Sequence, residues 1–197
     1  PSPDAAHNTA IGRQRVDSAF NESRANEPYP PLEVGIGLNY GPLILGTVGE
    51  VNRMDTTVSA DSVNLCSRLE GLCKLYGKGI IVPFEFLDTL ENPDMYHWRY
   101  LGLIRVQGRK KPVEVVHIYD GLPDEDFNRF HTTKTRFEDA LHLYRNSEYE
   151  RAMEEFRKLA TETPDDPALF TFMTQIHRLI ASGLGDEWDG IECVPVK

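Results

Sequence analysis

The sequence contains no long apolar run, few cysteines and no excess of basic residues. No stretch approaches the roughly 18 apolar residues of a membrane-spanning helix, so we expect no membrane contact by this chain. Three cysteines, Cys66, Cys73 and Cys193, are too few for a disulfide framework and favour a reduced, cytoplasmic protein. The net charge of −10 argues against binding of nucleic acid, which requires a basic surface.

Targeting and metal-binding patterns are also missing. The chain has no signal-peptide pattern and begins at Pro1, and we interpret it as a fragment of a longer protein, whose membrane tethering stays open. The six histidines lack metal-ligand spacing, so we interpret them as surface residues or as hydrogen-bonded core residues. Residues 121–197 carry nine Lys and Arg against 16 Asp and Glu, whereas residues 1–120 carry 12 against 15. The first part therefore retains enough cations to bind an anionic substrate.

Residues 1–120 alternate between strand and helix patterns. A helix is expected over 4–26, with apolar positions at Ala10, Ile11, Val16 and Phe20. In 32–38 apolar residues alternate with polar residues and glycines, which predicts a strand whose glycines allow another backbone or a ligand to come close. Further strands are expected at 43–48, 56–58, 79–82, 98–106 and 113–119. Helices are expected at 84–90 and from Ala60 or Asp61 to the glycines at 77 and 79. This order predicts an α/β (α+β) layered fold.

Three amphipathic helices are expected after a boundary near 121–126. Their apolar positions are Phe137, Ala140, Leu141 and Tyr144 in the first; Ala152, Met153, Phe156 and Leu159 in the second; and Phe170, Met173, Ile176 and Ile180 in the third. The C-terminal part is therefore predicted to be an all-α appendage.

The most informative residues are Asn64 and Arg68. They are four residues apart on a predicted helix, so they share one face, and both can donate hydrogen bonds to a phosphate and a nearby ribose oxygen. On spacing alone, a solvated helix face remains the more common alternative.

Several stretches resemble class III adenylate and guanylate cyclases. Residues 56–68, TTVSADSVNLCSR, are similar to the signature T-V-x-G-D-x-V-N-x-A-S-R, with Ala60 in place of Gly and Cys66 in place of Ala. VGIGLNYGPLILGTVG, RLEGLCKLYGKGIIV and LGLIRVQGRKKPVEVVHIYD resemble further family elements in the same order. The resemblance covers about residues 4–120. It implies a partial class III cyclase sandwich (ferredoxin-like, βαββαβ-derived) over 1–121, followed by a helical appendage over 122–197.

The resemblance implies a role for individual residues. Asn64 would orient the ribose while its 3′-hydroxyl attacks the α-phosphate of ATP, and Arg68 would neutralise charge that develops on that phosphate. Thr57 matches a purine-selecting position of the adenylate type, although GTP stays open as a substrate. Arg109 or Lys110 falls near the lysine that binds the terminal phosphates.

The metal-binding half of the family's site has no counterpart in the sequence. These enzymes bind two Mg²⁺ or Mn²⁺ ions through two aspartates that would precede the helix at 4–26, so the ligands are expected in a missing N-terminal segment. In the family the site forms between two catalytic domains, which implies a homodimer. We therefore expect the complete protein to be an adenylate cyclase and this fragment to be inactive alone. The alternative is a non-catalytic, cyclase-like interaction module.

The C-terminal residues carry two further resemblances. FEDALHLYRNSEYERAMEEFRKLATETPDDP resembles one tetratricopeptide-like helix hairpin, and GDEWDGIECVPV resembles the W-D-G ending of some bacterial cyclases. A single repeat cannot bury its own apolar face, so we expect it to pack on the preceding domain or on its partner. A scaffold for other proteins is the alternative.

Overall fold

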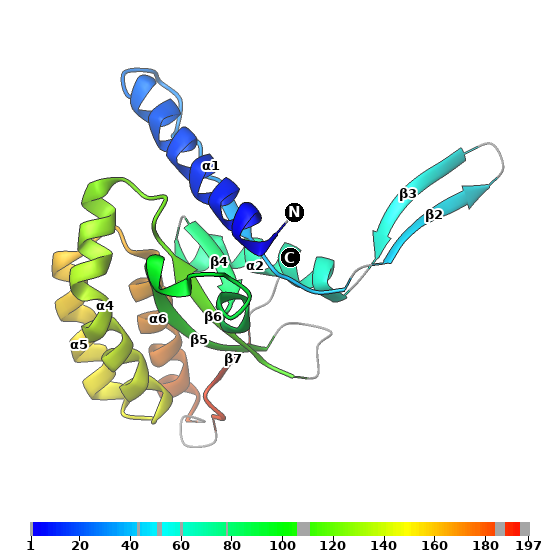
Figure 1. Ribbon diagram of the computed structural model, residues 1–197. Coiled ribbons are helices and arrows are strands. Elements are labelled where there is room, and N and C mark those ends of the chain that lie inside the picture. Colours follow the sequence, from blue (N-terminus) through cyan, green and yellow to red (C-terminus); the bar gives the residue numbers. More distant parts are fainter. Residues whose placement is uncertain are drawn as a thin grey trace.

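The computed structural model describes residues 2–42, 44–50, 53–59, 61–77, 79–105, 111–183 and 188–193, with the backbone alone for 44–50, 53–59 and 193. Helices and strands alternate before three successive helices (Figure 1). The elements are α1 (Pro3–Ser23), β1 (Gly35–Gly37), β2 (Ile44–Glu50), β3 (Arg53–Ser59), α2 (Asp61–Tyr76), β4 (Gly79–Pro83), α3 (Phe84–Leu87), a 3-10 turn (Pro93–Met95), β5 (Trp98–Arg105), β6 (Val113–Ile118), α4 (Asp124–Arg145), α5 (Tyr149–Glu162), α6 (Pro167–Ser182) and β7 (Ile191–Cys193).

A five-stranded mixed sheet forms the centre of the molecule. Its strand order is β1-β4-β6-β5-β7, with β1 parallel to β4, β7 parallel to β5 and antiparallel pairing between β4, β6 and β5. Strands β2 and β3 form a separate antiparallel hairpin that extends away from this sheet (Figure 1). The predicted α+β class and the helical C-terminal part are confirmed.

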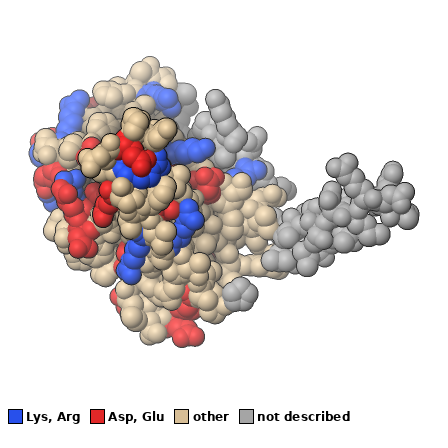
Figure 2. Space-filling view, turned by 90° about the horizontal axis from the view of Figure 1, so that it is seen from above, with Lys and Arg blue, Asp and Glu red and all other residues tan. Residues whose placement is uncertain are grey.

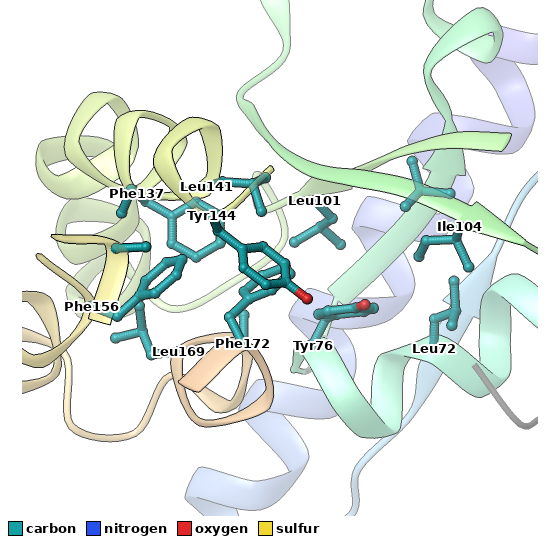
Figure 3. Close-up of a cluster of buried hydrophobic side chains, with 14 of the residues drawn as sticks. Leu72, Tyr76, Leu101, Ile104, Phe137, Leu141, Tyr144, Phe156, Leu169 and Phe172 are labelled. Carbon is teal, nitrogen blue, oxygen red and sulfur yellow. The ribbon is translucent and has the colours of Figure 1, made fainter. Parts of the chain in front are cut away.

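Helices cover both faces of the sheet. On one face, α1 and α3 pack on alternate residues of β4 and β6, including Ile80 and Val116. On the other face, α2 and the C-terminal helices α4–α6 share one hydrophobic cluster with Ile81, Leu101 and Ile104 of the sheet (Figure 3). We call residues 124–183, which include α4–α6, the helical tail. Its apolar side chains complete the core over that face of the sheet, as expected for a hairpin that cannot bury its own apolar face.

The predicted apolar faces of two helices are correct only in part. In α6, Phe170 and Ile180 are about half exposed, and the buried residues are Ala168, Leu169, Phe172 and Ile176. In α1, Val16 and Phe20 are exposed, and His7, Gln14 and Asp17 join Ala10 and Ile11 on the buried face. Apolar residues occur around most of α6, so the local pattern alone does not select the face that packs.

Strand β7 was not predicted from the sequence. It pairs with β5 through Leu103↔Ile191, while the Trp188 ring lies 4.6 Å from that of Tyr144. The Trp188 indole N–H donates to the carbonyl of Ile191 at 3.1 Å, and the Tyr144 hydroxyl donates to Glu192. The W-D-G segment therefore turns the chain so that a short strand covers the edge of β5.

Charged side chains of the helical tail form ion pairs at its surface, such as Arg136–Glu162 at 2.8 Å and Lys158–Glu154 at 2.9 Å. Figure 2 shows Lys and Arg interspersed with Asp and Glu on the face seen from above. Exposed pairs of this kind contribute little to stability, because water and salt screen the charges. Within the described residues, no helix combines the length and apolarity needed to span a bilayer.

Among the described residues, one ion pair is buried. Arg99 of β5 is 1% exposed and Asp166, which precedes α6, is 3% exposed. Arg99 donates to both carboxylate oxygens of Asp166, one of them at 2.9 Å, and its guanidinium lies 4.1 Å from the Phe130 ring centroid and 4.6 Å from that of Phe137. Asp166 also accepts from the Ala168 amide at 3.1 Å and so caps α6. One carboxylate thus connects the sheet to the helical tail.

Asp166→Asn should lower the free energy of unfolding by about 3–5 kcal/mol, because the amide retains the cap but leaves the buried Arg99 charge without a counter-ion. Chemical denaturation measures this change. Glu162→Ala, which removes the exposed partner of Arg136, is the control and should cost about 0–1 kcal/mol. Adding Arg99→Met to Asp166→Asn should restore much of the loss; equal instability of the single and double variants would contradict this account.

His7 does not fit the interpretation of the histidines as surface or hydrogen-bonded residues. Its side chain is fully buried and its ring contacts that of Tyr96 edge-on at 4.0 Å. Neither ring nitrogen has a hydrogen-bond partner within the described residues. Burial lowers the pKa of His7 below its ordinary value and outweighs Asp120 and Asp4, which act in the opposite direction. The neutral imidazole is therefore the form that packs.

The free energy of unfolding should fall as the pH drops below about 6.5, because the unfolded chain then protonates His7 before the folded chain does. His7→Phe should flatten this part of the stability profile, measured by denaturation between pH 8 and pH 5. His177→Phe, at an exposed position of α6, is the matched control and should leave the slope unchanged. An unaltered slope in His7→Phe would show that other groups cause the acid sensitivity.

Candidate active site

Helix α2 carries the two residues singled out by the sequence. It begins at Asp61, whose carboxylate lies in the first turn, where the helix dipole favours a negative charge. The buried stripe of the helix consists of Leu65, Leu69, Leu72, Cys73 and Tyr76. Asn64 is exposed and Arg68 is half-buried, so both lie off that stripe and one turn apart.

Glycines of β1 allow α2 to lie directly against the sheet. A Cβ on Gly37 would come within 2.3 Å of the Cys66 carbonyl oxygen and 2.5 Å of the Glu70 nitrogen, both backbone atoms of α2. A Cβ on Gly35 would come within 2.5 Å of Cys73 Cβ. This confirms the prediction that these glycines permit close approach of another backbone. The chain after β1 also contacts the start of α2, where the Ser62 hydroxyl donates to the carbonyl of Pro42 at 3.1 Å.

The cysteines of α2 are packing residues. Cys66 is half-buried and Cys73 is buried, and burial raises the pKa of both thiols, that of Cys73 to about 11. Both are therefore protonated at neutral pH. The Cys73 thiol donates weakly to backbone carbonyls of β1 and α2, which again places the helix against β1.

Asn64 and Arg68 are available to a ligand. In the parts of the chain that the structure describes, neither side chain has a hydrogen-bond or ion-pair partner. The opposite face of α2 packs against β1, so the position of the helix is fixed. The amide of Asn64 and the guanidinium of Arg68 can therefore both donate hydrogen bonds to phosphate and ribose oxygens of a ligand. Their preorganised dipoles suit stabilisation of developing negative charge.

The remaining predicted site residues are only partly described. Thr57 lies in β3, opposite Gly46 of β2 in the hairpin that precedes α2, and its side chain is not described. Arg109 and Lys110 lie outside the described residues. Their proposed contacts with a nucleotide therefore stay predictions.

The described side chains do not fit a divalent metal. Among these residues, no group of three or more His, Cys, Asp or Glu side chains could hold an ion. No chemical step is therefore assigned here to a metal bound by this chain.

A hollow of about 570 Å³ lies elsewhere, between the carboxyl end of α2 and α6, where Lys74, Phe170 and Arg178 contribute to its lining. Lys74 is six residues beyond Arg68, which corresponds to about 9 Å along the helix. The hollow is thus separate from the Asn64–Arg68 face. The sequence predicted where α2 ends but not which side chains contact that end; Arg99, a charged residue within an apolar strand pattern, was the one available sign of a buried charge there.

Comparison with known proteins relates the chain to nucleotide cyclases. It is 32% identical over 120 residues to an adenylate cyclase of Anabaena cylindrica, covering 58% of this chain and 24% of that protein. It is 29% identical over 139 residues to the terminal-differentiation-specific adenylate cyclase of Dictyostelium discoideum, covering 70% of this chain and 6% of that protein. Relatives of this chain therefore include adenylate cyclases. It spans a quarter or less of the length of these two relatives, and no family model matches it.

Solved structures of cyclases overlap with the chain in part. The adenylyl cyclase CyaB from P. aeruginosa is 30% identical, with a TM-score of 0.42 over 54% of this chain and 52% of that chain. The guanylyl cyclase Cya2 is 26% identical, with a TM-score of 0.47 over 61% of this chain and 60% of that chain.

Gly37→Ala should destabilise the protein by about 1–3 kcal/mol, because the added methyl group forces the backbone of α2 away from β1. Denaturant unfolding measures the change. Gly12→Ala is the matched control: Gly12 is exposed in α1 with no described atom within 4 Å of the added Cβ, so alanine should raise stability by up to about 1 kcal/mol. If both substitutions changed the free energy of unfolding equally, α2 could move away from β1 without loss of stability.

Proposed function

We propose that this chain is part of an adenylate cyclase that converts ATP to 3′,5′-cyclic AMP and pyrophosphate in the cytoplasm. The observation that supports this most directly is the pair Asn64 and Arg68, accessible and without described protein partners on one helix. They lie in a stretch similar to the cyclase signature, and the homologues of the chain are adenylate cyclases.

Within this proposal the two side chains have distinct tasks. Asn64 donates to the ribose and orients its 3′-hydroxyl for attack on the α-phosphate. Arg68 donates to that phosphate as negative charge accumulates and pyrophosphate leaves. Thr57 contacts the adenine, and Arg109 or Lys110 binds the terminal phosphates. Each contribution is electrostatic or positional, and those of Asn64 and Arg68 are of the kind that a fixed helix provides.

The proposed active enzyme is a homodimer with the site at its interface. As the resemblance to class III cyclases implies, we propose that a segment outside these 197 residues supplies the Mg²⁺ or Mn²⁺ ligands; the described side chains offer no group that could hold such an ion. Strand β1 is the last strand of the described sheet on its side, next to α2. An open edge of this kind can accept a further strand, so a neighbouring segment or subunit can approach the Asn64–Arg68 helix there.

We also propose the division into a cyclase part, 1–121, and a tetratricopeptide-like appendage, 122–197. Helices α4 and α5 form a hairpin whose buried stripe in α5 is the one expected, Ala152, Met153, Phe156 and Leu159. Because this stripe packs into the shared core, we favour a packing role over a scaffold for other proteins.

The test is cyclase activity of the longer protein that contains this chain, assayed with ATP and GTP in the presence of Mn²⁺. Asn64→Ala and Arg68→Ala should each lower kcat by about 100-fold or more, as loss of a transition-state hydrogen-bond donor does. Asn128→Ala and Arg151→Ala, at exposed positions of α4 and α5, are matched controls that should keep full activity.

The present chain and the longer protein carrying Asn64→Ala and Arg68→Ala should each have almost no cyclase activity alone. Mixing them should restore cyclase activity in the mixed dimer. The preferred nucleotide in this assay decides between ATP and GTP. If the mixed dimer forms but has no cyclase activity, the result would favour the alternative that this chain is a non-catalytic interaction module.

A further inference from the structure

The carboxyl end of α2 is covered by side chains from outside the helix. The last carbonyls of a helix have no partner within it and need one elsewhere. The Thr171 hydroxyl of α6 donates to the Leu75 carbonyl at 2.6 Å, and Arg99 Nη2 lies 3.5 Å from the Tyr76 carbonyl oxygen. Two of the final carbonyls of α2 therefore receive donors from α6 and β5.

The helical tail holds both donors. Thr171 belongs to α6 itself, and the Arg99 guanidinium is fixed by Asp166 and by the rings of Phe130 and Phe137. If the tail moved, Arg99 would lose its counter-ion and its aromatic contacts together. The position of both donors at the end of α2 thus depends on the tail.

An aromatic contact reinforces this junction. Tyr76, the last residue of α2, is 1% exposed, and its ring lies 5.5 Å from that of Phe172. Figure 3 shows Tyr76 beside Phe172 and Tyr144 of the tail. The next residue, Gly77, has a φ of 106°, and a Cβ there would come within 3.2 Å of Pro167 at the start of α6. The chain after α2 therefore lies close against the start of α6 at this point, beside the hollow described above.

We propose that the helical tail sets the axial position of α2, with Thr171 and Arg99 as positioning residues for Asn64 and Arg68. The proposal rests on the catalytic role proposed above for Asn64 and Arg68. Arg68 is seven residues before Leu75, about two helical turns, and a continuous helix transmits a displacement of one end to the other. Strand β1 contacts the side of α2 and limits sideways movement of the helix. The tail contacts its carboxyl end and limits movement along the helix axis.

Thr171→Val is the decisive variant, because it removes the hydroxyl and keeps the shape of the side chain. In the longer protein it should lower kcat about tenfold and change KM for ATP less than twofold, because displaced groups weaken the transition state more than ground-state binding. Thr171→Ser keeps the donor and should restore kcat. Thr174→Val, at an exposed position of the same helix, is the matched control and should behave as wild type.

A second measurement reports on α2 without any activity. In the present chain, Thr171→Val should shift the amide NMR resonances of Asn64 and Arg68 and speed hydrogen exchange along α2, whereas Thr171→Ser and Thr174→Val should not. Changes confined to the last turn of α2, with kcat unaltered, would overturn the proposal.

The two proposals fail in different ways. If Asn64→Ala and Arg68→Ala retain activity, the catalytic role is wrong, and the resonances of Asn64 and Arg68 alone then decide whether the tail positions α2. If those variants are inactive while Thr171→Val keeps both wild-type kcat and wild-type resonances, the catalytic role stands and positioning by the tail is wrong.

Discussion

The buried ion pair between Arg99 and Asp166 is the contact on which the arrangement of the helical tail depends. Both groups are removed from water, so neither can be left alone without a large cost in free energy. Asp166 at the same time caps α6, and Arg99 lies behind the end of α2. A single carboxylate therefore couples the sheet, the helix of the candidate site and the tail, and the three share one hydrophobic cluster.

Helix α2 has a fixed side and an accessible side. Its buried stripe lies on β1, where glycines let the two backbones approach, and its final carbonyls receive donors from outside the helix. The accessible side presents Asn64 and Arg68 without described protein partners. This asymmetry matters for the proposed chemistry, because hydrogen-bond donors stabilise developing charge best when they need no reorganisation during the reaction. Fixing such donors requires packing behind the helix.

Local patterns in the sequence predicted the parts of this arrangement that depend on neighbouring residues. Alternation in 32–38 predicted β1, its glycines predicted the close backbone, and helical spacing placed Asn64 and Arg68 on one face. The patterns failed where distant segments decide the structure: β7 is only three residues long and forms against β5, and α6 turns Phe172 rather than Phe170 inward because Tyr76, Phe137 and Phe156 surround that position. The pairing of Arg99 with Asp166 joins residues 67 apart and has no local signal.

Among the described residues, one edge of the sheet is covered by a further strand and the other is not, and this difference affects how the proposed enzyme could assemble. Strand β7 pairs with β5, and the Trp188 indole N–H donates to the carbonyl of Ile191 at the start of β7, so that edge is covered from within the chain. At the opposite side β1 is the outermost described strand, short, rich in glycine and directly beneath α2. Unpaired strand edges favour the addition of another strand. For the proposed enzyme, this edge is where a second segment could approach the helix that carries Asn64 and Arg68.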